Sequence, residues 1–325
     1  MRIKIKEIEK LCLEILRKKG LGAKDARVIL NEYLDSELRG ISCHGFQSFV
    51  NFGTKLVENA GPPKIKKQGA NFLYIDGNKN LGQIVCNKYV PKLIEKAKKR
   101  AIAMMGIFNM HSYLRPGTYA RIAAENNLVG FVFNYGGWKR IAPYGSIDPF
   151  FGTNPIAIGV PGQKFPVVVD FATSKIALMK IRLAAKLNKK IVKDLAIDKN
   201  GNPTTDPNEA MAGALLPFGS YKGSGLALVL DLLTKTMFGI DIKEKVKANR
   251  GFLFIFLNPK MFTNVKRFKK DVTKTTEKMK KLRKAKGFNE IQIPGEREQK
   301  LYEENLKRGY IDLDKKIFKE IKNLL

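Results

Sequence analysis

The chain has 325 residues and a mass of 36.6 kDa, with 44% hydrophobic and 28% charged residues. This composition excludes a disordered, collagen-like or disulfide-stapled chain, and the length predicts one large domain and a smaller one. No apolar run is long enough to cross a bilayer, and the charged opening lacks the apolar stretch of a secretory signal. We therefore expect a cytoplasmic protein that does not enter a membrane, with free thiols at its three scattered cysteines.

The charge balance is strongly basic, with 60 Lys and Arg against 30 Asp and Glu and a formal net charge of +30. Such an excess is one signature of nucleic-acid-binding proteins, and residues 266–286 form the densest basic run. A solvated helix face explains this run as well, because Phe268, Val272, Met279 and Leu282 recur at roughly helical spacing. The chain has no RNA- or DNA-binding motif. We favour the solvated helix and do not expect nucleic acid as a partner.

The N-terminal part of the chain is predicted to be helical. Apolar residues at helical spacing predict one helix that ends at Gly20 and a second that ends at Gly40, then a loop and a short helix before Gly61. We place a helical region at residues 1–70 and expect the C-terminal tail, residues 296–325, to pack on it.

From residue 71 onward, short apolar runs alternate with helical patterns. Helices are predicted at residues 82–100, where Pro91 should kink or split the helix, then at 117–126, after Asp170, from Gly225 and along the basic run. Consecutive strands after residue 128 favour antiparallel or mixed pairing. The sequence thus predicts an α/β (α+β-like) protein in which residues 71–295 hold a mixed, largely antiparallel sheet. The predicted strands are residues 72–76, 101–108, 128–133, 154–161, 165–171 and 251–257.

The chain has only two histidines, His44 and His111, as candidates for acid–base chemistry near neutral pH. Each lies in a polar loop that contains glycine, not on an apolar helix face. Imidazole has an unperturbed pKa of about 6.5, so it can give and take protons near neutrality. Either residue alone is explained as well by an ordinary surface histidine. Together they are the better candidates for catalysis.

Residues 216–225 form a glycine-rich loop that leads into an apolar helix. Gly219, Gly223 and Gly225 allow a ligand to approach the backbone closely, and the helix start offers unpaired N–H groups to an anion. Lys222 adds a positive charge. The spacing matches neither of the common nucleotide-binding motifs, so an anion site and a plain tight turn are equally good interpretations.

No metal site is predicted. Two histidines without an HExxH motif supply too few ligands for zinc. Residues 198–209 imitate a calcium-binding loop, but Pro203 occupies the position where the turn needs glycine. A nucleophilic serine is not indicated either, because the chain has no GxSxG motif.

Several segments, in this order, resemble the malate/L-lactate dehydrogenase-like family, which also contains L-sulfolactate, ureidoglycolate and 2,3-diketogulonate oxidoreductases. The resemblance extends over nearly the whole chain. The segments are LDSELRGISCHGFQSF (34–49), NMHSYLRPGTYARIAAENN (109–127), IAPYGSIDPFFGTNPIAIGVP (141–161), VDFATS (169–174), LPFGSYKGSGLAL (216–228) and IPGERE (293–298).

The resemblance implies an NAD- or NADP-dependent oxidoreductase that interconverts a 2-oxo acid and a 2-hydroxy acid of the malate, lactate or sulfolactate type. A cyclic imino acid is a further possible substrate. It implies hydride transfer with His44 or His111 as the proton donor, a homodimer, and a cofactor domain of non-Rossmann type. Candidate substrate residues are Ser48, Thr153 and Asn154. The positions that match cofactor-binding residues of the family are Asn134, Val168, Val169, Asp170, Phe171, Ala172, Thr173, Ser174, Tyr221, Lys222, Gly295 and Glu296.

Some positions depart from the family pattern. Family members commonly have an arginine four residues after the first histidine, which suits bidentate binding of a carboxylate, and this chain has Ser48 there. Cys43, Tyr135 and Met179 also replace the common residues. These departures leave one alternative open, a catalytically impaired relative that keeps the fold, and the net charge of +30 leaves a second, a basic nucleic-acid-binding protein.

Overall fold

A seven-stranded sheet organises the larger part of the protein, whose computed structural model describes residues 1–50, 60–240 and 250–325. The strands are β2 (Lys64–Gln68), β3 (Phe72–Asp76), β4 (Ile102–Phe108), β5 (Val129–Asn134), β6 (Ile156–Val160), β7 (Val167–Phe171) and β10 (Phe252–Leu257). Their order in the sheet is β2-β3-β4-β10-β5-β6-β7. Every neighbouring pair is antiparallel except β3 and β4, which are parallel. The predicted mixed, largely antiparallel sheet is confirmed.

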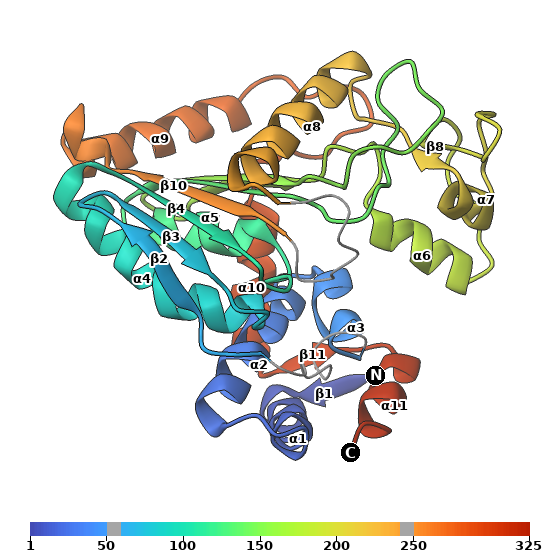
Figure 1. Ribbon diagram of the computed structural model, residues 1–325, viewed down its shortest axis with the longest axis horizontal. Coiled ribbons are helices and arrows are strands. Elements are labelled where there is room, and N and C mark those ends of the chain that lie inside the picture. Colours follow the sequence, from blue (N-terminus) through green and yellow to red (C-terminus); the bar gives the residue numbers. More distant parts are fainter. Residues whose placement is uncertain (51–59, 241–249) are drawn as a thin grey trace.

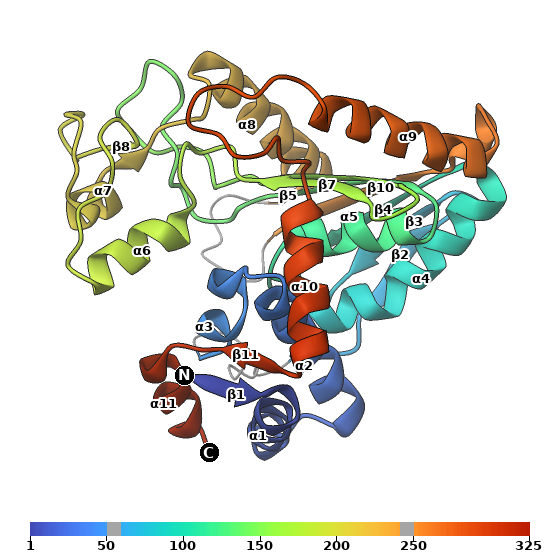
Figure 2. The same ribbon diagram turned by 180° about the vertical axis from the view of Figure 1, so that it is seen from behind.

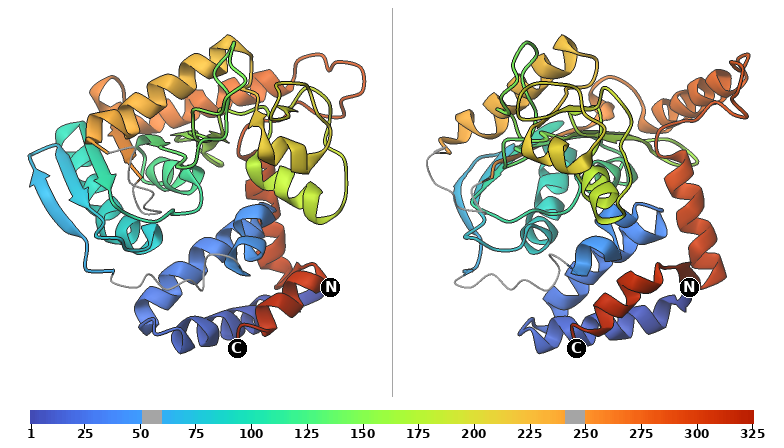
Figure 3. Two further views of the ribbon diagram at one scale, coloured as in Figure 1. Left: turned by 45° about the vertical axis from the view of Figure 1, so that its right-hand side comes forward. Right: turned by 90° about the vertical axis from the view of Figure 1, so that its right-hand side faces the viewer.

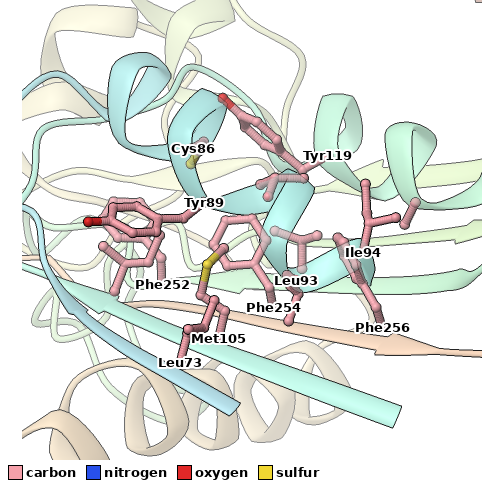
Figure 4. Packing of buried hydrophobic residues seen from close by; sticks show 14 of the residues in the cluster. Leu73, Cys86, Tyr89, Leu93, Ile94, Met105, Tyr119, Phe252, Phe254 and Phe256 are labelled. Atoms are coloured by element: carbon pink, nitrogen blue, oxygen red, sulfur yellow. The ribbon is translucent and has the colours of Figure 1, made fainter. Parts of the chain in front are cut away.

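Helices cover both faces of this sheet (Figures 1 and 3). One face carries α4 (Gly82–Arg100) and α5 (Pro116–Glu125), and the other carries α8 (Tyr221–Thr234) and α9 (Val265–Lys280). The main core lies beneath α4 and α5. Side chains alternate across a strand, so β10 directs Phe252, Phe254 and Phe256 into this core, where Tyr119 of α5 meets them (Figure 4). Each buried ring contributes about 1.5–3 kcal/mol.

Pro91 does not split α4, which is one continuous helix from Gly82 to Arg100. Proline removes the hydrogen bond to the carbonyl four residues earlier, which belongs to Asn87. Both Pro91 and Asn87 are exposed, so water can bond to the carbonyl that the proline leaves unpaired. The predicted split of the helix is therefore wrong, and a kink at Pro91 stays a prediction.

Residues 266–280 of the basic run lie in α9, as predicted, whereas residues 281–286 follow the end of the helix. Asn264 caps the helix, because its Oδ1 accepts hydrogen bonds from the N–H groups of the next turn at 2.9 and 3.2 Å. Phe268 and Val272 are half-buried, but Met279 and Leu282 are 40% and 62% exposed. The predicted apolar face is therefore present only in the first half of the run. A second difference concerns α8, which begins at Tyr221, one turn before the predicted start.

A smaller helical unit contains both chain termini (Figure 1). Its core joins residues from both ends of the chain, such as Ile8, Cys12, Ile311 and Phe318. Helix α10 runs from the sheet to this unit (Figure 2), so the tail packs on the N-terminal helices. Its elements are β1 (Arg2–Lys4), α1 (Ile5–Lys18), α2 (Ala23–Leu38), η1 (Ser42–His44), α3 (Phe46–Ser48), α10 (Glu296–Arg308), β11 (Tyr310–Asp312) and α11 (Lys315–Lys322).

The antiparallel pair β1–β11 was not predicted. Residues 64–68, which the sequence analysis grouped with the helical region, pair with β3 in the large sheet. The short helix predicted before Gly61 falls on residues 51–59, outside the described part of the chain. A further small lobe consists of α6 (Leu178–Lys186), β8 (Ala196–Ile197), α7 (Pro207–Ala212) and β9 (Ala214–Leu215). Among the helices of the described residues, none combines the length and apolarity that crossing a membrane requires.

Candidate active site

The loop that carries His44 is fixed by a buried carboxylate at the end of α2. Glu37 accepts a hydrogen bond from Ser42 Oγ at 2.7 Å and another from the Phe46 N–H at 2.9 Å. A side chain at Gly45 would place its Cβ 2.1 Å from Glu37 Oε2, so the close approach requires glycine. The loop is thus held on both sides of His44 by one residue.

The surroundings of His44 keep its imidazole neutral. Burial, and then the positive charge of Arg115, lower the pKa of His44 to about 4. Its Nδ1 lies 3.3 Å from Cys43 Sγ. Ser48, a candidate substrate residue, is buried and its hydroxyl donates to the Cys43 carbonyl at 2.8 Å. The Ser48 side chain therefore supports the loop.

The segment that carries His111 is tied to the sheet at two points. The Tyr113 hydroxyl donates to Asn134 Oδ1 at the end of β5 at 3.0 Å, and both residues are buried. The Gly117 N–H donates to Asp170 Oδ2 on β7, also at 3.0 Å. The His111 segment therefore lies against two of the candidate cofactor-binding positions.

The segments of the two histidines border one another. Leu114 packs against the hydrophobic cluster of the helical unit, which includes Phe46. Arg115 is close enough to His44 to lower its pKa. The structure thus brings together the surroundings of His44 and His111, while the approach of the two rings themselves stays a prediction.

One end of β7 meets the start of α10. The Val168 N–H donates to the Pro294 carbonyl at 3.1 Å, and Gly295, with a φ of +87°, lies against the Val168 backbone. Glu296 accepts hydrogen bonds from Lys280 and Lys300. Burial raises its pKa, but these two lysines outweigh burial and lower it overall. A cavity of about 240 Å³ between α9 and β7 includes Glu296 in its lining.

The other end of β7 meets two loops. The Thr173 N–H donates to the Thr153 carbonyl at 3.0 Å, and the Thr173 carbonyl accepts from the Phe218 N–H at 3.0 Å. Ser174 forms a further bridge with Pro217. Residues 168–174 therefore contact Gly295 and its neighbour at one end of β7, and Thr153 and the loop before α8 at the other. These candidate residues come from separate parts of the sequence.

Asn154 is fully buried, and its amide bonds inside the protein. Its Oδ1 accepts from the Gly136 N–H at 2.9 Å, and its Nδ2 donates to the Ala227 carbonyl at 3.0 Å. Asn154 has a φ of +28°, in the left-handed region that asparagine tolerates better than most residues. Its side chain joins the loop at Gly136 to α8.

Tyr221 and Lys222 lie at the exposed start of α8. Tyr221 is 63% exposed and packs edge-on against Tyr144, with ring centroids 6.3 Å apart. Ser220 precedes the helix with a φ of +62° and makes no side-chain cap. The first N–H groups of a helix lack intrahelical partners and attract anions, and Lys222 stands beside them.

The comparisons with known proteins identify the family of the chain. The family model described as malate/L-lactate dehydrogenase matches residues 3–322. The chain belongs to the malate/L-lactate dehydrogenase family. Within that family, it is 34% identical over 336 residues to the malate/(S)-sulfolactate dehydrogenase of Methanothermus fervidus, across 100% of this chain and 97% of that protein.

Two further relatives show the breadth of the family. The structure of the sulfolactate dehydrogenase from Methanocaldococcus jannaschii superimposes with a TM-score of 0.88 at 32% identity and covers 100% of this chain and 96% of its own. A Δ1-pyrroline-2-carboxylate reductase of Ancylobacter novellus is 30% identical over 276 residues, 81% of each chain. Membership in the malate/L-lactate dehydrogenase family places the chain among oxidoreductases, and the neighbouring structure confirms the fold class.

A group of charged residues that supports this site was not predicted from the sequence. Asp35 binds Arg115, Arg39 and Arg121, each at 3.0 Å. The sequence contained a local indication for Arg39, which follows Asp35 by four residues at the C-terminal end of α2. The pairs with Arg115 and Arg121 join α2 to α5, and no pattern in the sequence indicated that contact.

Proposed function

We propose that the chain is an NAD- or NADP-dependent oxidoreductase of the cytoplasm that interconverts a 2-oxo acid and a 2-hydroxy acid, with His44 as the proton-transferring residue. The observation that carries the proposal is the contact of residues 168–174 with the His111 segment, with the loop that precedes α8 and with the residues just before α10, in a member of a dehydrogenase family. The three cysteines are free thiols, which supports a reducing compartment.

The residues along β7 fit a nicotinamide cofactor in their chemistry. The start of α8, together with Lys222, supplies N–H groups and a cation for a pyrophosphate. Asn134 offers a polar side chain at the end of β5. Thr173, in contrast, is buried and bonds to Thr153 and Phe218, and Gly295 packs directly on the Val168 backbone, so these two residues shape the edge of the proposed site. When bound, the cofactor supplies or accepts the hydride.

His44 is suited to the proton step in both directions. In oxidation of a hydroxy acid, the neutral imidazole accepts the proton of the hydroxyl group while the carbon loses a hydride, which leaves a carbonyl. In reduction, the protonated imidazole donates to the oxygen of the carbonyl as the hydride arrives. A pKa of about 4 favours the neutral form in the free enzyme, so the negative charge of a bound substrate is needed to raise it for reduction.

The relatives support a substrate that carries at least one acid group. Malate and sulfolactate each carry a second anionic group, and the names of the relatives include both. Of the three candidate substrate residues, Thr153 is only half-buried, whereas the side chains of Ser48 and Asn154 bond within the protein. We assign Thr153 to substrate contact. A cyclic imino acid is the second candidate substrate because of the pyrroline-carboxylate reductase relative.

An exposed apolar face supports the proposal of a homodimer. On α8, Leu228, Val229 and Leu232 are each close to half exposed, and Met237 follows them. Soluble proteins rarely expose a contiguous apolar patch of this kind unless another surface covers it. We propose that two copies of the chain associate through this face of α8.

Two measurements test the proposed function. Titration of the purified protein with NADH and NADPH, followed by nicotinamide fluorescence, is expected to show binding of at least one of them. Turnover is then measured with malate, sulfolactate, lactate and Δ1-pyrroline-2-carboxylate as a panel. Absence of binding to either cofactor would overturn the proposal, and binding without turnover would indicate a catalytically impaired relative.

A further inference from the structure

The end of β5 and the start of β10 lie side by side at one edge of the candidate site. The Tyr135 N–H, just after β5, donates to the Gly251 carbonyl, just before β10, at 2.9 Å. Asn134, a candidate cofactor residue, bonds through its side chain to the His111 segment. Arg250 precedes Gly251 and therefore lies next to residues that we propose for the cofactor.

Two glycines in the loop after β5 bring Arg250 close to Thr153. A Cβ at Gly136 would lie 2.9 Å from Thr153 Oγ1, and a Cβ at Gly137 would lie 3.0 Å from Arg250 Nε and 3.1 Å from its Nη2. Consecutive Cα atoms are only about 3.8 Å apart. The Thr153 hydroxyl, which we assign to substrate contact, and the Arg250 guanidinium therefore adjoin the same short stretch of backbone.

The charge of Arg250 is not matched by a carboxylate of the described residues. Lys235 also lies beside this loop, with its Nζ 5.2 Å from the centroid of the Tyr135 ring, but Asp231 pairs with it at 3.3 Å. No described Asp or Glu pairs with Arg250 in this way. Its side chain is half-buried, and burial lowers its pKa, with a smaller opposing effect of Tyr135. A bound anion stabilises a partly desolvated cation of this kind.

The candidate substrate residues supply no positive charge of their own. Ser48, Thr153 and Asn154 are neutral, and the side chains of Ser48 and Asn154 bond inside the protein. The proposed substrate is a 2-oxo or 2-hydroxy acid, which is an anion at neutral pH. A guanidinium suits such a group, because its planar fork donates two parallel hydrogen bonds to two oxygen atoms.

We propose that Arg250 binds an acid group of the substrate through both arms of its guanidinium, beside the Thr153 hydroxyl. This inference rests on the proposed function. The acid group, a carboxylate or a sulfonate, provides the anion that Arg250 lacks among the described residues. Arg250 thereby selects acids over neutral ketones and alcohols.

The test measures the binding of an acid without turnover. Malate cannot react with NADH or NADPH, because both partners are already reduced, so nicotinamide fluorescence reports its dissociation constant for the complex with the reduced cofactor. In Arg250→Met we expect this constant to rise about 10- to 100-fold, since a pair of charge-assisted hydrogen bonds is lost. Arg250→Lys keeps the charge but loses the fork, so a rise of about three- to tenfold is expected. The dissociation constant of the cofactor itself should stay unchanged in both variants.

A matched control and a second acid sharpen the test. Lys139 is an exposed cation of the same loop, with its Nζ 5.7 Å from the centroid of the Phe150 ring, and Lys139→Met should leave the affinity for malate in place. Lactate serves as the second acid. Weaker binding of both acids in Arg250→Met assigns the contact to the carboxylate beside the reacting carbon, and weaker binding of malate alone assigns it to the second acid group.

Four outcomes would overturn the inference or its basis. Wild-type affinity for malate in a folded Arg250→Met contradicts the inference, and so does an equal loss in Lys139→Met. If Arg250→Met does not fold, Arg250→Lys decides, because an unchanged affinity there excludes contact through both arms. A wild type that turns over a hydroxy acid while both Arg250 variants bind malate normally is the failure of this inference alone. A wild type that binds neither NADH nor NADPH is instead the failure of the proposed function.

Discussion

The two sides of the candidate site differ in how firmly the protein holds them. On the side of α2, Arg39 and Arg115 are buried and converge on Asp35, and Glu37 fixes the His44 loop. On the side of β7 and α8, Phe171 and Tyr221 are 43% and 63% exposed. The protein therefore fixes the side that we propose for proton transfer more firmly than the exposed residues on the side that we propose for the cofactor. Groups that must act in a transition state gain from preorganisation, whereas a cofactor must be able to enter and leave.

The strongest test of this difference removes the imidazole at the preorganised side. His44→Gln is expected to lower kcat/KM by about 10²- to 10⁴-fold, because a positioned general acid or base contributes that much. The dissociation constant for the cofactor should change little, since the loop of His44 is held by Glu37 and not by the imidazole. Steady-state kinetics and fluorescence titration measure the two quantities. His111→Gln is the matched variant, and a full loss there with activity kept in His44→Gln would reverse the assignment.

A second test breaks the buried network that supports the same side. Asp35→Ala leaves Arg39, Arg115 and Arg121 without their shared anion, so we expect the free energy of unfolding to fall by about 3–5 kcal/mol. Urea unfolding followed by circular dichroism measures the loss. Glu14→Ala is the control, because its pair with Lys18 is exposed and contributes at most about 1 kcal/mol. Equal losses of unfolding free energy in both variants would mean that the Asp35 network stabilises the protein no more than an exposed ion pair does.

The fold could be predicted from sequence wherever a pattern is local and long enough. The strand β10 and the helix α4 were found because hydrophobic residues repeat over many positions. The pair β1–β11 was missed because each strand has three residues and its partner lies at the other end of the chain. The consequence of Pro91 was misjudged because solvent exposure, which satisfies the freed carbonyl of Asn87, is a property of the folded helix.

The candidate site shows the same limit. His44 and His111 were found because the chain has no other histidine and because their segments resemble a family. Arg115 was overlooked because its importance arises from Asp35, which is 80 residues away in sequence and on another helix. The direction of a side chain could not be predicted from the sequence either: Asn154, a candidate substrate residue, points into the protein and bonds to Ala227. The sequence identifies candidate residues by their type and local setting, but the partners of their side chains depend on tertiary packing.

Glu32 allows a test of the preorganised side that depends on pH. It accepts a hydrogen bond from Tyr119 at 3.0 Å, and its Oε2 has no partner among the described residues. Burial raises its pKa to about 7 in the folded protein, and the negative charge of Asp35 adds to the rise. The hydrogen bond from Tyr119 and the positive charges of Arg115 and Arg121 oppose the rise. The unfolded chain binds fewer protons than the folded one between about pH 4 and pH 7, so stability declines as pH rises through that window.

The variant Glu32→Gln is neutral at every pH and keeps an oxygen for the Tyr119 hydroxyl. Relative to the wild type, it should gain about 1–3 kcal/mol in free energy of unfolding at pH 8 and little at pH 4. Urea unfolding of both proteins at the two pH values measures the difference. A difference that stays constant with pH would show that Glu32 does not titrate in this range.

The smallest expected effect belongs to the open side and concerns Lys222. Its exposed side chain makes no hydrogen bond or ion pair to a described residue, so Lys222→Met should change the free energy of unfolding by less than about 0.5 kcal/mol. A charge-assisted contact with the pyrophosphate would be lost, however, and the dissociation constant for the cofactor should rise about tenfold, which is ~1.4 kcal/mol. Fluorescence titration with NADH or NADPH measures this rise, and the exposed Lys199→Met serves as the control for a change in net charge. If both variants weaken binding equally, Lys222 acts only through the overall positive field. If Lys222→Met instead destabilises the fold as the loss of Asp35 does, the contrast between a rigid catalytic side and an open cofactor side is wrong.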